Sequence, residues 1–422
     1  MKKILFMVVF VLPTLLFSQK IIKLPLTYND SYGIFNPSYT VLSAGIDTVK
    51  TNALPIKGIP KNWKNIKKRI ITTDFNQYIY QQFLSKEISK ETYKEYAGEP
   101  SKRKLVAKTT KCFVYLVIGE LPNGQKMIVV DANNNSDVSD ETPVALLPNE
   151  DYSGAKNEAN QVITKISYDR IIDGKAIPAS TFLILFTAGK RILYNFKHSA
   201  TTEIIINNKT VKLGVNSGFT NMGNDGYTFI ALDTLKSGKI KPEWQINEQE
   251  YIVIEGTVFK YLGIDDAENV LKLKQMKEKQ SEIVAMQIGF KLPDFSETAF
   301  ISEKKINLED FKGKYVYLDF WGTWCSPCVQ EIPHLKALYE KLDLSKIAFI
   351  GIARDEKPAL EKFLNKENLK WDQILVGDDK LIEKYNVKGF PTTFLIDPNG
   401  KIIAKNLRAK ALEDTLNELL KK

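Results

Sequence analysis

Trp321-Gly322-Thr323-Trp324-Cys325-Ser326-Pro327-Cys328 places two cysteines three positions apart in a chain of 422 residues. The preceding residues 315–320 are apolar and rich in β-branched and aromatic side chains, which is typical of a buried strand. Apolar residues then recur at three- and four-residue steps from Ile332 to Leu342, which indicates one face of a helix. Both cysteines are therefore expected where a strand turns into a helix. The dipole and free N–H groups of a helix N-terminus favour a thiolate there.

Two thiols with this spacing permit three kinds of chemistry. They can close a structural disulfide, supply half of a tetrahedral zinc site, or work as a redox-active dithiol. Zinc needs two more Cys or His ligands, and the chain has only 3 cysteines and 2 histidines, with no second pair at metal-ligand spacing. A disulfide that closes so short a loop removes little chain entropy and adds little stability. These observations favour a redox dithiol and leave a structural disulfide open.

Length and charge limit the remaining function classes. A chain of 422 residues exceeds what one hydrophobic core usually organises, so two or more domains are expected. The formal net charge of +9 comes from lysines scattered along the chain, without a basic stripe that carries interleaved aromatic residues. Nucleic-acid binding is therefore not expected.

Residues 1–18 have the pattern of a secretory signal peptide. Lys2 and Lys3 precede the apolar run 4–17, and Ser18 supplies a small residue before a cleavage point. The run is shorter than the roughly 20 residues of a membrane span. We therefore expect an exported protein of the periplasm or cell envelope, attached to a membrane only if the signal sequence stays uncleaved.

Residues 19–263 are expected to form a β-rich region with some helix. Short runs of alternating or β-branched residues are separated by hairpin-type turns such as Asn123-Gly124 and Asp173-Gly174. This pattern is typical of an antiparallel sandwich or barrel. Residues 77–96 lack Gly and Pro and are predicted to be helical.

Three further boundaries follow from changes of pattern along the chain. The β-rich region is expected to contain two subdomains, 19–104 and 105–263. Residues 264–284 are polar and lack Gly and Pro, so we predict a helical or flexible connector. In residues 285–422 strands alternate with helices, which indicates an α/β domain with some parallel strand pairing.

One loop of the β-rich region is a candidate calcium site. Oxygen-bearing side chains stand at alternate positions, namely Asp131, Asn133, Asn135 and Asp137. Calcium loops use this spacing because the cation takes several oxygen ligands around a tight turn. However, Ser136 stands where the calcium-loop pattern has glycine, so a solvated Asn/Asp turn is the alternative.

Three motifs in the C-terminal part occur in a characteristic order. Leu292-Pro293-Asp294-Phe295 comes first, and the octapeptide with its two cysteines follows. The segment Gly389-Phe390-Pro391-Thr392-Thr393-Phe394-Leu395-Ile396-Asp397 comes last. With these motifs, residues 290–422 resemble the thioredoxin fold, and more narrowly the TlpA/ResA-like exported thiol–disulfide oxidoreductases. The resemblance covers about a third of the chain and does not extend to residues 19–285.

The chemistry expected of the cysteines is thiol–disulfide exchange. Cys325 should be the attacking thiolate, since it comes first at the helix N-terminus, and Cys328 should resolve the resulting mixed disulfide. The resemblance implies that the two form a disulfide in the oxidised state. The expected partners are protein thiols and disulfides and an upstream electron donor, and no cofactor is expected.

Two carboxylates are candidates for taking the proton of Cys328. Asp319 lies inside an apolar strand, where burying a carboxylate is unfavourable for folding. It is therefore either a proton acceptor or a hydrogen-bonded structural acid. Glu331 stands three positions after Cys328, on the same side of the predicted helix. The resemblance implies that each position can hold a functional acid. Which of the two carries the proton stays open.

The resemblance also implies a substrate-binding surface. It places a cis peptide bond between Phe390 and Pro391, packed against the dithiol, and we expect Trp324 to form an apolar wall beside it. The favoured function is an exported oxidoreductase that reduces protein disulfides. The alternative is a binding protein whose β-rich region captures a ligand or partner, with the thioredoxin-like part as an accessory.

Overall fold

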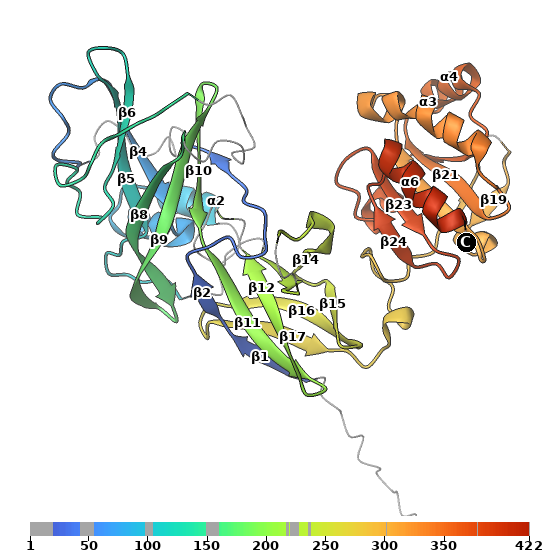
Figure 1. Cartoon of the computed structure of the whole chain (residues 1–422), viewed down its shortest axis with the longest axis horizontal. Helices are drawn as coiled ribbons and strands as arrows, with labels where there is room; N and C mark the ends of the chain where they lie inside the picture. Colours follow the sequence, from blue (N-terminus) through green and yellow to red (C-terminus); the bar gives the residue numbers. More distant parts are fainter. Residues whose placement is uncertain are drawn as a thin grey trace, which may run out of the picture.

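The computed structural model describes residues 20–42, 55–97, 104–148, 160–216, 219, 228–234, 238–300, 302–377 and 379–421. These residues form two β-sandwiches and a C-terminal α/β domain (Figure 1). The predicted signal sequence, residues 1–18, lies outside them. None of the helices built from these residues is both long enough and apolar enough to cross a membrane.

The first sandwich is built from both ends of the N-terminal region. The strand order of one sheet is β1 (Ile21–Pro25), β17 (Val270–Gln275), β16 (Thr257–Asp265), β15 (Tyr251–Ile254). The strand order of the other sheet is β14 (Ile246–Asn247), β13 (Phe229–Leu232), β12 (Lys209–Asn216), β11 (Ser199–Ile206), β2 (Thr27–Asn29). Inward-facing residues of both sheets, including Leu213, Phe259 and Leu271, form its core.

The second sandwich is inserted between β2 and β11 of the first. The strand order of one sheet is β3 (Thr40–Val41), β10 (Arg191–Lys197), β9 (Lys175–Ala188), β8 (Val162–Ile172). The strand order of the other sheet is β4 (Lys64–Thr72), β5 (Phe113–Glu120), β6 (Lys126–Val130), β7 (Val144–Ala145). Leu116, Ile166 and Leu185 lie in the core between these two sheets. The prediction of a β-rich, antiparallel N-terminal region is thus confirmed.

A pair of short helices covers part of the second sandwich. We predicted one helix over 77–96, and the structure has α1 (Phe75–Leu84) and α2 (Lys90–Ala97) instead. The break falls at Lys86, whose φ of 62° is left-handed and cannot continue a right-handed helix.

The predicted division of the N-terminal region at 104/105 does not match the strand pairing. β4 lies before that boundary and pairs along its length with β5, which follows it. β1 likewise pairs with β17, from Ile21 opposite Lys274 to Pro25 opposite Val270. The chain therefore leaves the first sandwich, builds the second, and returns.

The predicted connector is also shorter than residues 264–284. β16 extends to Asp265, and β17 occupies 270–275. Along β17 the buried residues Leu271 and Leu273 alternate with Lys272 and Lys274. This is the period-2 pattern of a half-buried strand, so the prediction of a helical or flexible connector is wrong for these residues.

The C-terminal domain has a five-stranded sheet at its centre. The parallel strands are β20 (Tyr315–Trp321), β21 (Ile347–Arg354) and β22 (Asp372–Val376), and the antiparallel strands are β23 (Thr392–Ile396) and β24 (Ile402–Lys405). The sheet order is β22-β21-β20-β23-β24. The helices are α3 (Ser326–Lys341), α4 (Lys357–Glu367), α5 (Lys380–Lys384) and α6 (Ala409–Leu420). A hairpin of β18 (Ser296–Thr298) and β19 (Lys305–Asn307) precedes them.

The central strand β20 divides the domain into two cores. Val316, Leu318 and Phe320 belong to one core, together with the residues before β18 and the helix α5. Tyr317 and Trp321 belong to the other core, which also contains residues of α3, α4 and α6 and both cysteines of the octapeptide. Because side chains alternate along a strand, Asp319 points to the same side as Tyr317 and Trp321.

The segment from 276 to 290 joins the first sandwich to the C-terminal domain. The side chain of Gln287 accepts a hydrogen bond from the N–H of Tyr251 at 2.7 Å and donates one to its C=O at 3.0 Å. Lys405 Nζ, at the end of β24, donates to the C=O of Met286 at 2.7 Å. Since Tyr251 begins the edge strand β15, Gln287 satisfies backbone groups that a further strand would otherwise pair.

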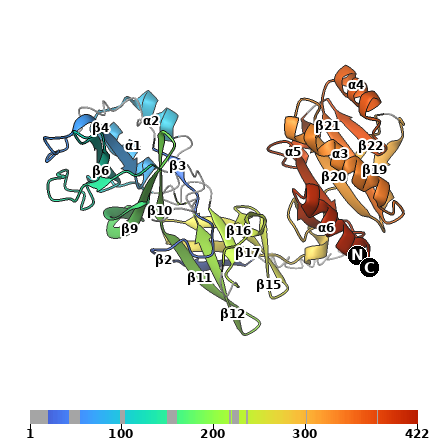
Figure 2. The same cartoon turned by 45° about the horizontal axis from the view of Figure 1, so that its top comes forward.

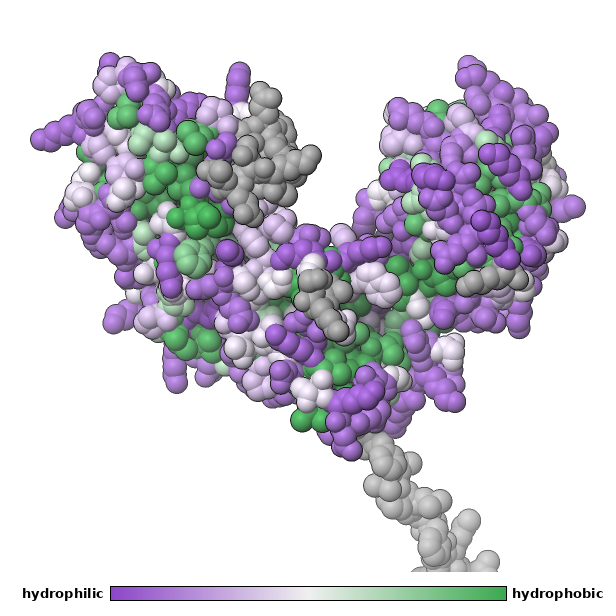
Figure 3. Space-filling view, in the orientation of Figure 1, coloured by the Kyte–Doolittle hydropathy of each residue, from purple (hydrophilic) through white to green (hydrophobic). Residues whose placement is uncertain are grey.

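The second sandwich and the C-terminal domain lie on opposite sides of the first sandwich in both cartoon views (Figure 2). The space-filling view shows a wide hollow between them, with apolar residues exposed over the first sandwich at its base (Figure 3).

Candidate active site

The two cysteines lie where β20 ends and α3 begins. Cys325 is the N-cap residue of α3, and its sulfur accepts a hydrogen bond from the backbone N–H of Cys328 at 3.3 Å. The sulfur atoms form a disulfide, with an S–S distance of 1.97 Å and a Cα–Cα distance of 5.2 Å. A thiolate on Cys325 would be stabilised by the N–H donor and by the positive end of the helix dipole.

Exposed aromatic side chains mark the surface beside the disulfide. Trp324 is 58% exposed, and its indole N–H donates to the C=O of Arg354 at 2.8 Å. Its ring packs edge-to-face against Phe390, with ring centroids 5.3 Å apart. The Phe390–Pro391 peptide bond is cis. Two segments far apart in the sequence therefore form one apolar surface beside the disulfide. Each cysteine itself is less than 5% exposed.

Polar groups that sequence reasoning missed hold the octapeptide in place. The backbone N–H of Thr323 donates to Asp355 Oδ2 at 2.6 Å, just after β21. Trp321, which is buried, donates from Nε1 to Gln373 Oε1 at 3.0 Å. Gln373 is a polar residue inside a buried strand, and that exception to the apolar pattern was the available signal.

Asp319 lies in the core that contains both cysteines. Its carboxyl group is buried, and this burial raises its pKa from 3.8 to about 7. The negative charge of Glu331 adds to the increase, whereas the positive charge of Arg408 opposes it. A carboxyl group with such a pKa exchanges its proton near neutral pH, as a general base for a thiol must.

Glu331 lies on α3 and faces the start of α6. Its Oε1 accepts a hydrogen bond from the backbone N–H of Ala409 at 2.5 Å. Ala409 is the first residue of α6, so the carboxylate lies at the positive end of that helix. The side chain is 15% exposed. The charge of Glu331 influences the pKa of Asp319, so the two carboxyl groups interact electrostatically. Glu331 is the more accessible of the two.

The predicted calcium loop is held by its own hydrogen bonds. Asp131 accepts from the backbone N–H groups of Asn135 and Ser136, at 2.9 and 2.8 Å. Asn133 and Asn135 both donate from Nδ2 to Asp140, at 2.8 Å each. Asp137 accepts from the backbone and hydroxyl of Ser139. The side-chain oxygens thus serve the turn, and calcium binding there stays a prediction.

Metal binding has little support among the side chains. Within the described ranges no three His, Cys, Asp or Glu residues come together as a group that could hold a metal ion.

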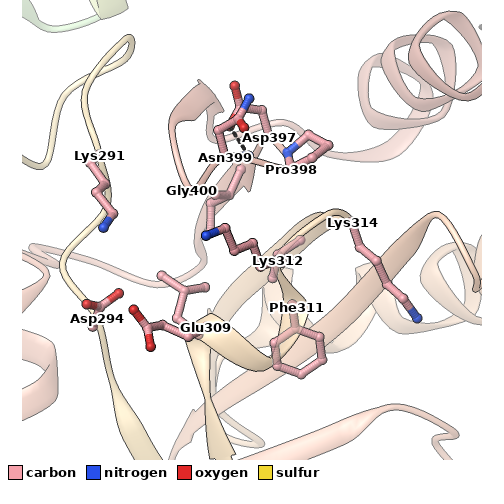
Figure 4. A pocket seen from close by; sticks show the side chains of 13 residues that line it. Lys291, Asp294, Glu309, Phe311, Lys312, Lys314, Asp397, Pro398, Asn399 and Gly400 are labelled. Carbon is pink, nitrogen blue, oxygen red and sulfur yellow. Dashed lines mark hydrogen bonds between the residues drawn. The ribbon is translucent and has the colours of Figure 1, made fainter. Parts of the chain in front are cut away.

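A small cavity of about 110 Å³ lies at the other end of β20 from the disulfide. Its lining mixes lysines with carboxylates, including Lys291, Asp294, Glu309 and Lys312 (Figure 4). Asp397 lies at the upper side of the cavity in this view. It accepts hydrogen bonds from the N–H groups of Asn399 and Lys401, at 2.9 Å each, which hold the turn that lines this side. A strand of seven residues is about 23 Å long, so this cavity is separate from the dithiol.

Comparison with known proteins places the C-terminal domain. The model of the AhpC/TSA family matches residues 288–405. The thiol-disulfide oxidoreductase ResA of Bacillus anthracis is 39% identical over 138 residues, which are 32% of this chain and 79% of ResA. ResA of Geobacillus kaustophilus is 36% identical over 123 residues, covering 29% of this chain and 70% of that protein.

Solved structures with similarity to this chain include the thioredoxin domain of a thiol-disulfide oxidoreductase from Bacteroides vulgatus. That match has 32% identity and a TM-score of 0.30, and it covers 33% of this chain and 99% of that one. A thiol-disulfide oxidoreductase from Bacteroides fragilis matches with 31% identity and a TM-score of 0.28, covering 31% of this chain and 99% of that one. The identity with ResA extends over most of the ResA chain. Through its C-terminal domain, this chain belongs to the ResA family of thioredoxin-fold thiol–disulfide oxidoreductases.

Proposed function

We propose that this protein is an exported enzyme that reduces disulfides of other proteins through the Cys325–Cys328 dithiol. The observation that carries the proposal is the position of Cys325 at the N-cap of α3, where the N–H of Cys328 donates to its sulfur. This arrangement lowers the free energy of a thiolate on Cys325 relative to an ordinary thiol. It therefore prepares Cys325 to attack.

The reaction consists of two exchange steps. The Cys325 thiolate attacks one sulfur of the substrate disulfide, so a mixed disulfide forms and one substrate thiolate leaves. The Cys328 thiolate then attacks Cys325 Sγ, which forms the Cys325–Cys328 disulfide and releases the second substrate thiolate. Two electrons pass from the enzyme to the substrate, and the two substrate thiolates take up their protons from solvent. An upstream dithiol donor must then reduce the enzyme again.

The second step needs a base, because Cys328 is buried and starts as a thiol. We assign this role to Asp319, since burial raises its pKa to about 7, so that the carboxylate takes up a proton near neutral pH. Glu331 lies nearer the surface and interacts with Asp319 through its charge. In this assignment Glu331 hands the proton onward and does not take it from the thiol.

The substrate surface is formed by Trp324, Phe390 and Pro391. Trp324 is exposed and packs on Phe390, so an extended polypeptide can lie over apolar rings while its disulfide reaches Cys325. Export rests on the sequence of residues 1–18 alone. A location in the periplasm or cell envelope follows from that reading.

Equilibration with glutathione redox buffers tests the direction of the reaction. Dithiols of this type span roughly −270 to −120 mV, and we expect a value in the reducing half of that range. A potential near −120 mV would refute the reductase assignment. Trapping tests the substrate class, because Cys328→Ser should accumulate mixed disulfides with protein substrates on Cys325, and Cys325→Ser should not.

Cys112 does not interfere with such trapping. Its side chain is fully buried, and burial raises the pKa of its thiol to about 12. The group therefore stays a protonated thiol at the pH of the experiment.

A further inference from the structure

His334 lies between two carboxylates at the interface of α3 and α6. Its Nδ1 is 3.8 Å from Glu331 Oε1, and its Nε2 is 3.9 Å from Glu413 Oε2. Nδ1 is buried and makes no hydrogen bond with the described part of the chain. A buried polar atom without a partner costs free energy, so its presence calls for a functional explanation.

His334 and the acidic groups around it extend from the core to the surface. Asp319 is buried on the side of β20 that faces the core with both cysteines, and Glu331 acts on it through its charge. The side chain of Glu331 is 15% exposed, that of Glu413 28%, and that of His334 34%. The series thus leads from the core that holds Cys328 to the protein surface.

We propose that His334 transfers to solvent the proton that Cys328 releases, acting through Glu331 on the buried Asp319. This inference deepens the proposed function and rests on it. His334 is a positioning and relay residue, because it touches neither the sulfur atoms nor the substrate. Imidazole suits the role because one ring nitrogen can accept a proton while the other donates one.

The proton balance is as follows. The S–H bond of Cys328 breaks and an O–H bond forms on Asp319, which leaves the Cys328 thiolate free to attack Cys325. Asp319 passes its proton to Glu331, and Glu331 passes it to Nδ1 of His334. The ring then releases the proton on Nε2 to Glu413, which passes it to water, and proton exchange with water restores the starting tautomer of the ring. Each carboxylate returns to its starting state, and the thiol has lost one proton to solvent.

Other charged groups at this interface do not supply an alternative path. Arg408 lies close enough to Asp319 to influence its charge, but a guanidinium keeps its protons. Lys410 is 2.6 Å from Asp414 and 3.9 Å from Glu413, so its ammonium group belongs to the surface pairs of α6. Tyr317 donates its hydroxyl hydrogen to the C=O of Leu407. Of these groups, only His334 has two nitrogens that face carboxylates from α3 and α6.

Stopped-flow oxidation of the reduced full-length protein by an excess of a peptide disulfide tests the relay. His334→Gln should leave formation of the mixed disulfide within about twofold of wild type, because Cys325 attacks without this path. The rate at which Cys328 resolves the mixed disulfide should fall in this variant by a factor on the order of ten to a hundred in weak buffer. Free imidazole should restore the rate, which a merely structural role of His334 would not allow.

Two further variants and the wild type complete the test. Glu413→Gln, a milder change at the same interface, should slow resolution in the same direction, and Lys410→Gln should leave both steps unchanged. Unaltered resolution in His334→Gln, or a loss that imidazole does not restore, would overturn the relay while wild type still reduces disulfides. A wild-type protein that does not react with the peptide disulfide would overturn the proposed function and the relay together.

Discussion

Replacement of Asp319 by Asn should stabilise the protein in alkaline solution. The carboxyl group has a pKa of about 7 in the folded protein, against an ordinary value of 3.8. Each unit of pKa corresponds to about 1.4 kcal/mol, so ionising this buried acid lowers the free energy of unfolding by about 4 kcal/mol. Asn has nearly the same shape and cannot ionise, so it avoids this cost.

The pH window follows from the number of protons bound. Below pH 3.8 the acid is protonated in both folded and unfolded chains, and it contributes no penalty. Between 3.8 and about 7 the folded protein binds more protons than the unfolded chain, so stability falls as pH rises. Above pH 7 the penalty is complete. Between pH 5 and pH 8, wild type should lose on the order of 3 kcal/mol of unfolding free energy that Asp319→Asn keeps.

Urea unfolding followed by pulsed hydrogen exchange is the suitable assay. Mass spectrometry of peptides from β20 reports the C-terminal domain within the full-length chain, so unfolding of the sandwiches does not obscure it. The exchange pulse is given at one fixed pH after equilibration at pH 5 or pH 8. Asp414→Asn is the matched control, because this residue of α6 has a side chain that is 60% exposed.

Equal pH dependence in wild type and Asp319→Asn would refute the reasoning, because the buried acid would then not ionise in this range. The same variant should resolve mixed disulfides more slowly by a factor on the order of a hundred, since it lacks the base. A variant that is both more stable and less active is expected where an active site keeps an unfavourable group for its chemistry.

Three further changes give separate predictions. Trp324→Ala should raise KM for protein disulfides about tenfold with little change for a small disulfide, and steady-state kinetics with both substrates checks this; equal effects on both would contradict a polypeptide-binding role. Gln287→Ala removes two hydrogen bonds to Tyr251, so limited proteolysis should cut residues 276–290 faster. An unchanged cleavage rate would mean that the segment joining the first sandwich to the C-terminal domain does not depend on this side chain. Leu271→Ala should destabilise the first sandwich by about 2–5 kcal/mol without changing disulfide reduction, and hydrogen exchange of β16 and β17 measures it; a parallel loss of activity would show that the active site depends on the first sandwich.

The C-terminal elements could be predicted because their signals are local. The strand before Cys325, the helix after it and the later alternation of strands and helices all appear in the structure at nearly the expected residues. Each depends on the period of apolar residues within one short segment. The resemblance then brought Phe390 next to the cysteines, which no local pattern could do.

The N-terminal architecture depends on contacts between distant segments. The sequence predicts short antiparallel strands in this region, but it does not predict which strands pair. The pairing of Ile21 with Lys274 joins residues at opposite ends of the region, and together with the pairing of β2 with β11 it shows that the second sandwich is an insertion. Alternation along β17 gives the strand and the buried face of each residue, but it does not identify the neighbouring strand.

The two ends of the proposed proton path differ in how visible they are in the sequence. Asp319 breaks the apolar pattern of β20, and a local exception of that kind marks a residue kept for its chemistry. His334 and Glu413 are polar residues on helices, which is ordinary, so neither breaks a rule. Their significance arises only where α3 packs against α6 and leaves Nδ1 of His334 buried beside Glu331. Sequence reasoning therefore finds the buried acid, and the packing of two helices is needed to find its route to solvent.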